Sequence, residues 1–116
     1  MARTKKIPFL QYFTKKKDGI ESRYIRIGNS LMLSNTIMGL NHLAYRIYTY
    51  MMLESGGKIE FEFPYSKFKK FSSKGGFQKA INELVEAGLI DIVAKNANLR
   101  IPNKYRFSIR WKDKEV

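Results

Sequence analysis

The chain has 116 residues, with 22 Lys and Arg against 10 Asp and Glu, one His and no Cys. This length suits a single domain with its own core, and a hydrophobic fraction of 44% argues against a disordered chain. The lack of Cys excludes disulfides, a thiolate nucleophile and cysteine-bound metals, and the single His excludes a His-rich metal site. We expect no metal and no other cofactor. The net charge of +12 favours a polyanionic partner, with nucleic acid first and an anionic membrane surface second.

The chain divides into three parts by composition. Residues 1–21 are polar and basic and predict a flexible arm, from which the aromatic residues between Phe9 and Phe13 could dock onto the body. Residues 22–112 predict the folded domain, and 113–116 a polar tail. No apolar run reaches the ~20 residues of a membrane helix, and no signal peptide follows the basic start. We therefore expect a cytoplasmic, nucleoid-associated protein with no membrane partner.

The first predicted elements are short. Residues 22–27 alternate between apolar and polar side chains, which predicts a strand that ends at Gly28. Residues 31–37 fit either a short strand or a helical turn.

A strong helix is predicted over residues 41–54, with Asn41 as its N-cap. Its apolar residues recur at the spacing of one helical face: Leu40, Leu43, Ala44, Ile47, Tyr48 and Met51. The other side is unusually apolar for solvent at Tyr45, Thr49, Met52 and Leu53. Either residues 1–37 cover that side, or it forms a homodimer contact; a homodimer through this helix or the N-terminal extension is thus a possible assembly.

The middle of the chain predicts a strand over 58–63 and, after Pro64, a short helix over 64–71 whose buried side holds Phe68 and Phe71. Ser73 can cap a third helix, over 74–87, and Gly88 can end it. The apolar stripe of that helix comprises Phe77, Ala80, Ile81 and Leu84.

Two strands complete the domain, over 89–93 and 104–112, joined by a polar loop. In the second strand Tyr105, Phe107, Ile109 and Trp111 are predicted to share one face. From residue 41 the order is helix, strand, helix, tight turn, helix, strand, loop, strand. This order predicts an α+β winged helix-turn-helix, in which a three-helix core carries a C-terminal β-hairpin wing and an N-terminal extension.

The basic charge gathers in three stretches. Residues 1–30 hold eight bases and two acids, residues 64–79 five Lys and no acid, and residues 95–112 six bases and no acid. Such segregation is what a surface that follows a phosphate backbone needs. The alternative is that these runs are ordinary solvated faces.

The third helix is the predicted recognition helix, because the residues opposite its apolar stripe suit base edges and phosphates. That far face holds Gly75, Gln78, Lys79, Asn82 and Glu86. Glu83 and Glu86 count against DNA contact, but both lie toward its C-terminal end. The candidate DNA-contacting residues, from this helix, the preceding turn and the wing, are Ser73, Lys74, Gln78, Lys79, Asn82, Lys67, Lys69, Lys70, Lys95, Asn98, Arg100 and Lys104.

Four stretches carry a family resemblance: RYIRIGNSLML, GLNHLAYRIYTYMM, SKGGFQKAINELVEAGLIDIV and RIPNKYRFS. Through them the chain resembles bacterial winged-helix proteins, in particular the N-terminal domain of RepA-type plasmid replication initiators of Firmicutes and their mobile elements. The resemblance implies that Lys74, Gln78, Lys79 and Asn82 lie on the recognition helix and Arg100 in the wing. The long C-terminal extension of those initiators is absent from this chain.

No pattern supports catalysis. The stretch Ser55–Lys58 resembles a phosphate loop but has Ile59 where that loop needs Ser or Thr. Glu60 and Glu62 alternate on a strand as a solvated face would, and His42 is the chain's single histidine at a helix start.

We expect a non-enzymatic protein that binds double-stranded DNA, as a transcriptional regulator or a replication-initiator-like protein of a mobile element. The alternative is a winged-helix assembly module with an acidic protein partner. RNA binding comes third, because the paired aromatic signature of the common RNA-binding sheet is missing.

Overall fold

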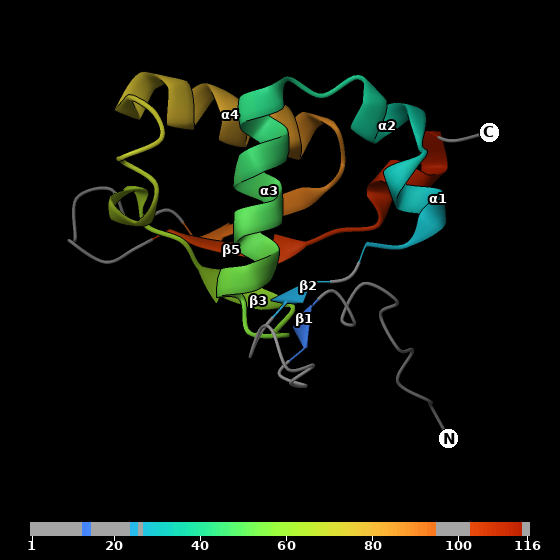
Figure 1. Cartoon of the computed structure of the whole chain (residues 1–116), viewed down its shortest axis with the longest axis horizontal. Helices are drawn as coiled ribbons and strands as arrows, with labels where there is room; N and C mark the ends of the chain where they lie inside the picture. The colour runs from blue at the N-terminus through green and yellow to red at the C-terminus, as the bar shows by residue number, and fades with distance from the viewer. Residues whose placement is uncertain (1–12, 15–23, 26, 95–102, 115–116) are drawn as a thin grey trace.

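The computed structural model describes residues 13–14, 24–25, 27–94 and 103–114, which form a small α+β domain (Figure 1). The elements run, in chain order, β1 (Phe13–Thr14), β2 (Tyr24–Ile25), α1 (Asn29–Met32), α2 (Asn35–Met38), α3 (His42–Glu54), β3 (Glu60–Glu62), the 3₁₀ helix η2 (Tyr65–Lys67), α4 (Lys74–Glu86), β4 (Ile90–Ala94), β5 (Lys104–Phe107) and the 3₁₀ helix η3 (Arg110–Lys114). β1 pairs with β2, and the segment 31–37 takes the helical of its two alternatives.

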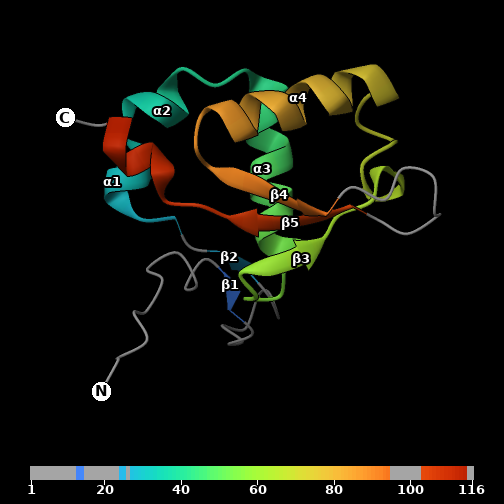
Figure 2. The same ribbon diagram turned by 180° about the vertical axis from the view of Figure 1, so that it is seen from behind.

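The main sheet is antiparallel and has β5 in its middle, with β3 on one side and β4 on the other (Figure 2). Phe61 lies opposite Tyr105 in the register, and both side chains are buried together with Phe107. The other face of the sheet is exposed and carries an ion pair between Arg106 and Glu60, with 3.5 Å from nitrogen to oxygen. The sheet is therefore covered by helices on one face only.

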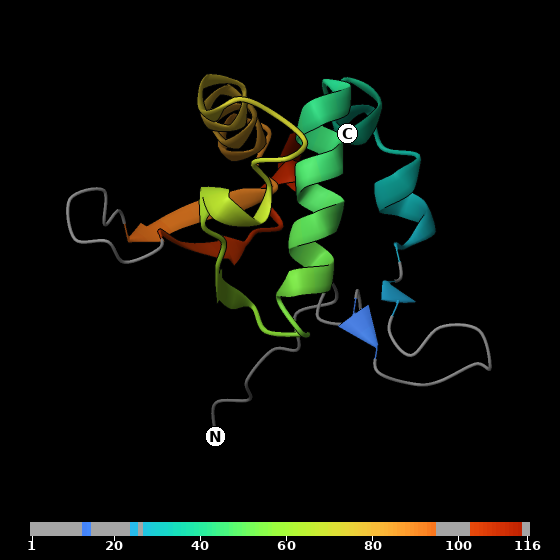
Figure 3. The same ribbon diagram turned by 60° about the vertical axis from the view of Figure 1, so that its left-hand side comes forward.

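The helix α3 stands between two layers, with the sheet and α4 on one side and β2 and α1 on the other (Figure 3). It begins as predicted, because the side chain of Asn41 accepts a hydrogen bond from the N–H of Leu43 at 2.8 Å. On its second side Met52 is fully buried, and the Tyr45 hydroxyl contacts the sulfur of Met32 on α1 at 3.8 Å. Residues before α3 thus cover this side, which is the first of the two predicted alternatives.

The predicted helix over 64–71 is wrong: only Tyr65–Lys67 form a helix, and it is a 3₁₀ helix. The reason is the spacing of the aromatic residues Tyr65, Phe68 and Phe71, which repeat every third position. A 3₁₀ helix has three residues per turn and aligns such positions, whereas an α-helix would rotate them apart. Phe68 is fully buried as predicted, but Phe71 is 39% exposed.

The predicted strand over 104–112 is also too long, since β5 ends at Phe107 and the chain turns into η3. Trp111 is buried, but Ile109 is 41% exposed, so these two residues do not continue the inward face of the strand. The cause is Gly88, which ends α4 at a φ of +83° and accepts a hydrogen bond from the N–H of Trp111 at 3.1 Å. A Cβ on Gly88 would lie 2.7 Å from that nitrogen, so only glycine lets the chain dock here.

The core joins α3, α4 and the sheet, as the apolar patterns predict. The predicted stripe of α4 is buried, and that of α3 is buried except for Leu43, which is partly exposed. None of the helices in the described part of the chain has the length and apolar character needed to cross a membrane.

Candidate nucleic-acid interface

The start of α4 is held in place by polar contacts of the preceding turn. The hydroxyl of Ser73 accepts a hydrogen bond from the N–H of Gly76 at 3.0 Å, which caps the helix as predicted. The hydroxyl of Tyr65 donates to the carbonyl of Ser72 at 2.7 Å and ties η2 to the same turn. Ser73 thus has a structural role here, whatever else it contacts.

Aromatic packing holds the turn between η2 and α4 against the core. Phe68 lies at the centre, with ring centroids 6.4 Å from Phe63, 6.1 Å from Phe77 and 5.9 Å from Tyr50. These residues come from η2 and its flanks, α3 and α4, so the cluster sets the position of α4 relative to both. The exposed face of α4 is therefore presented on a rigid support.

The predicted far face of α4 is exposed at every position: Gly75, Gln78, Lys79, Asn82 and Glu86. On it, the Gln78 side-chain amide donates to the Asn82 side-chain oxygen at 3.2 Å. The two amides thus lie next to each other, one turn apart, as an exposed pair of hydrogen-bonding groups.

The basic residues of the turn surround the beginning of α4. Lys67, Lys69, Lys70 and Lys74 are all exposed. Lys67 is paired with Glu54, with 3.4 Å between nitrogen and oxygen. Among the residues that the structure describes, no carboxylate lies within 4.0 Å of the other three or of Lys79. Their charge is therefore available to an external anion.

The wing residues are only partly described. Lys95, Asn98 and Arg100 lie outside the described residues. Lys104 opens β5, is exposed, and stands opposite Glu62 in the register. In Figures 1 and 2 this end of β5 lies at the same end of the molecule as η2 and the start of α4. The start of β5, η2 and the start of α4 therefore lie at one end of the domain.

Glu83 is turned away from this surface. Its carboxylate accepts a hydrogen bond from the N–H of Asn41 at 2.8 Å, at the N-terminus of α3. Because α3 has no acidic residue in its own first turn, Glu83 supplies the negative charge that the helix dipole favours there. Of the two residues that count against DNA contact, Glu83 thus has a structural role between α4 and α3, whereas Glu86 lies on the exposed face.

We expect Glu83→Gln to lower the free energy of unfolding by about 1 kcal/mol and Glu83→Ala by about 2 kcal/mol, because the first loses the charge and the second also the hydrogen bond. Urea unfolding at pH 7 measures both values. Glu86→Ala, one turn away on the exposed face, is the comparison and should change stability less. An equal loss from Glu83→Ala and Glu86→Ala would contradict the capping role.

Sequence reasoning missed Arg46 on α3. Its guanidinium carbon lies 4.4 Å from the centroid of the Phe71 ring, and the Lys70 ammonium lies 5.7 Å from the same centroid. The available signal was a lone Arg in the exposed row of an otherwise apolar helix. The contact itself depends on the turn after η2, which the predicted helix over 64–71 would have placed differently.

No other part of the described surface offers a stronger candidate. Within the described residues, no group of three or more His, Asp or Glu could hold a metal ion. Burial raises the pKa of Tyr105, against the effect of a side-chain hydrogen bond with Asn103, so this phenol stays protonated at neutral pH. Comparison of the chain with protein-family models, curated proteins and solved structures gives no match.

Proposed function

We propose that the chain is a winged helix-turn-helix protein that binds double-stranded DNA sequence-specifically, with α4 as its recognition helix. The observation that carries the proposal is the cluster of Lys69, Lys70 and Lys74 around the start of α4, which have no carboxylate within 4.0 Å among the described residues. The exposed face of α4 bears two neighbouring amides. Cations of this kind suit backbone phosphates, and side-chain amides suit the edge of adenine in the major groove.

The topology supports this proposal. From α3 onward the order is helix, strand, 3₁₀ turn, helix, strand, strand, and η2 stands where a winged helix has its second helix. In the strand order β3-β5-β4, the last two strands of the chain are antiparallel neighbours, as the two strands of a wing are.

Each candidate residue then has a distinct role. Lys69, Lys70 and Lys74 contact phosphates and set the orientation of the protein, whereas Gln78, Lys79 and Asn82 contact base edges. The hydrogen bond between Gln78 and Asn82 holds both amides in one orientation before DNA arrives, which lowers the entropy cost of binding.

The role of such a protein is transcriptional regulation or origin recognition on a mobile element, and the resemblance to RepA-type initiators supports the second. An assembly module with an acidic partner is the alternative class. An assembly module would bind its acidic partner through the same cations, but the neighbouring amides of Gln78 and Asn82 would have no role in that binding.

The test is a selection of duplexes from a random library, followed by affinity measurements on the selected site and on a scrambled duplex. We expect Lys79→Ala and Asn82→Ala each to cost ~1–3 kcal/mol on the selected site and clearly less on the scrambled one. Fluorescence anisotropy titration measures both affinities, and Lys58→Ala, an exposed lysine at the other end of α3, is the control.

Equal losses on both duplexes would make these two residues phosphate contacts. Wild-type affinity in both variants would remove α4 from the interface and overturn the proposal. Failure of the unmodified protein to bind any duplex at low salt would overturn it as well.

A further inference from the structure

We propose that Arg46, with Phe71 and Lys70, forms an additional binding site for a DNA backbone phosphate, which extends the interface from α4 onto α3. This inference rests on the proposed function and adds to it a contact on a helix outside the helix-turn-helix unit.

The site is built around an aromatic ring that is fixed yet partly open. The Phe71 ring packs against Phe68, with 4.9 Å between centroids, and meets Tyr50 edge-on at 6.1 Å and 83°. It nevertheless remains 39% exposed. The Arg46 guanidinium lies over this ring at 4.4 Å, and the Lys70 ammonium is 5.7 Å from its centroid.

Two positive charges thus share one ring without a neighbouring acid. Neither Arg46 nor Lys70 has a carboxylate within 4.0 Å in the part of the chain that the structure describes. The π face of the ring attracts cations and so helps to hold each of them near Phe71. An anion bound at this place would offset positive charge that no described carboxylate neutralises, so the arrangement favours anion binding.

The chemistry of a guanidinium points to a phosphate. The carbon of the Arg46 guanidinium lies over the Phe71 ring, 4.4 Å from its centroid. A guanidinium carries a planar fork of N–H donors that can pair with two oxygens of one phosphate. Because the ring already restricts the side chain, binding costs less conformational entropy than it would for an unstacked Arg or Lys.

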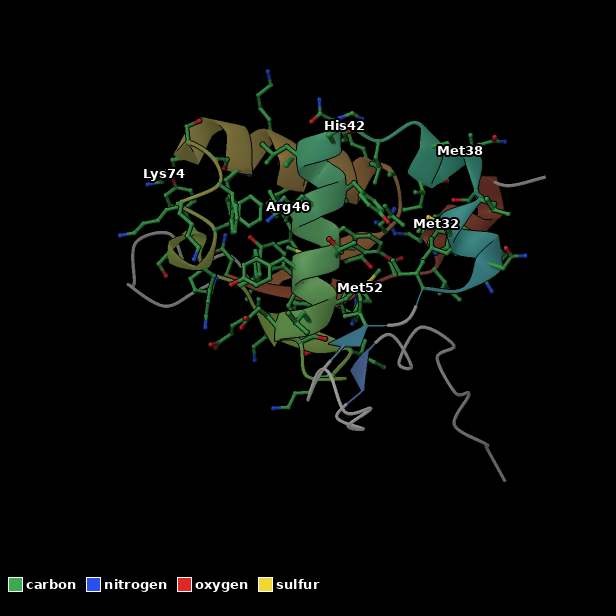
Figure 4. The ribbon with its side chains drawn as sticks, in the orientation of Figure 1. Met32, Met38, His42, Arg46, Met52 and Lys74 are labelled. Atoms are coloured by element: carbon green, nitrogen blue, oxygen red, sulfur yellow. The ribbon has the colours of Figure 1, made fainter. Side chains whose placement is uncertain are left out.

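The position of the site favours a DNA backbone as the source of that phosphate. Lys69 and Lys70 lie in the turn between η2 and α4, and Figure 4 shows Arg46 on α3 and Lys74 at the start of α4. A backbone that passes the start of α4 and follows the exposed cations of the turn therefore arrives at Arg46. An acidic polypeptide would meet the same charges, but its carboxylates lack the regular spacing of a duplex backbone.

The experiment compares four single variants of the full chain for binding to one mixed-sequence duplex over a range of salt concentrations. Arg46→Gln removes the charge, Arg46→Lys keeps the charge without the flat group, and Phe71→Leu keeps an apolar side chain without the π face. The matched control is Lys58→Gln, which lowers the net charge equally but lies beyond the C-terminal end of α3. Thermal melting of each variant shows that the fold is retained.

We expect Arg46→Gln to weaken binding about tenfold and to reduce the slope of log K against log salt by about 1. Arg46→Lys should keep the slope and lose part of the affinity, as should Phe71→Leu. Lys58→Gln should leave the slope unchanged. This pattern separates a direct phosphate contact from a general effect of net charge.

Three outcomes would overturn the inference. If the unmodified chain binds duplex and Arg46→Gln behaves as Lys58→Gln does, the site on α3 is absent while the proposed function stands. If polyglutamate binds as tightly as duplex and depends equally on Arg46, the ligand is a carboxylate of an acidic polypeptide. If the unmodified chain binds no duplex, the proposed function itself fails.

Discussion

Replacing Lys69, Lys70 and Lys74 together by Gln should weaken duplex binding by roughly several hundredfold at about 0.1 M salt, because each phosphate contact there contributes close to a factor of ten. If the whole interface contacts about 6 phosphates, the unmodified protein should show a slope of log K against log salt near −5. Loss of three of the six contacts should halve that slope, to about −2.5. The three lysines are exposed and carry no carboxylate partner in the described structure, so their removal should leave the fold intact.

The control is a second triple variant, in which Lys58, Arg106 and Lys112 are replaced by Gln. It has the same net charge as the first triple variant. These residues are exposed and lie outside the turn between η2 and α4. Fluorescence anisotropy titrations at four or more salt concentrations give the slopes for all three proteins. Equal slopes for the two triple variants would show that only net charge matters, and the basic turn would lose its place in the interface.

Phe68→Ala should lower the free energy of unfolding by ~3–5 kcal/mol, because it removes a fully buried ring and leaves a cavity. Small domains are stable by only about 5–15 kcal/mol, so the variant should be close to unfolding at 37 °C. Phe68 touches Phe63, Tyr50 and Phe77, and these contacts come from three parts of the chain that cannot all close the gap at once.

Phe71→Ala is the matched comparison, since the same substitution three residues later affects a ring that is 39% exposed. We expect it to cost about 1 kcal/mol or slightly more. Urea unfolding followed by circular dichroism measures both variants. Equal losses would mean that both rings are equally buried and would contradict the exposure of Phe71 in the structure.

The long elements of this protein are encoded locally. The apolar periodicity of residues 41–54 and 74–87, with the caps Asn41 and Ser73, was sufficient to predict α3 and α4 nearly to the residue. The exposed face of α4 followed from the same periodicity, so the basic and amide residues proposed to contact DNA could be recognised before their positions were known. Such features need only a helical repeat and a polar end group.

Short elements depend on neighbours that are distant in the sequence. The segment after Pro64 holds a 3₁₀ helix whose rings pack on distant residues, with Phe68 near Tyr50 and Tyr65 near Phe77. The strand β5 ends early because the backbone of Trp111 binds Gly88, a contact that alternation along the strand does not encode.

For the charged residues too, the sequence predicts one part and the tertiary structure decides the rest. Sequence alone identified an excess of cations, but it treated Glu83 as an acid on the binding helix and passed over Arg46. Tertiary packing turns Glu83 onto the N-terminus of α3 and brings Arg46 over Phe71, twenty-five positions further along the chain. Whether a charge is used within the fold or left for a partner depends on what lies within a few ångströms of it, and only the packing of α3 against α4 and the turn decides that.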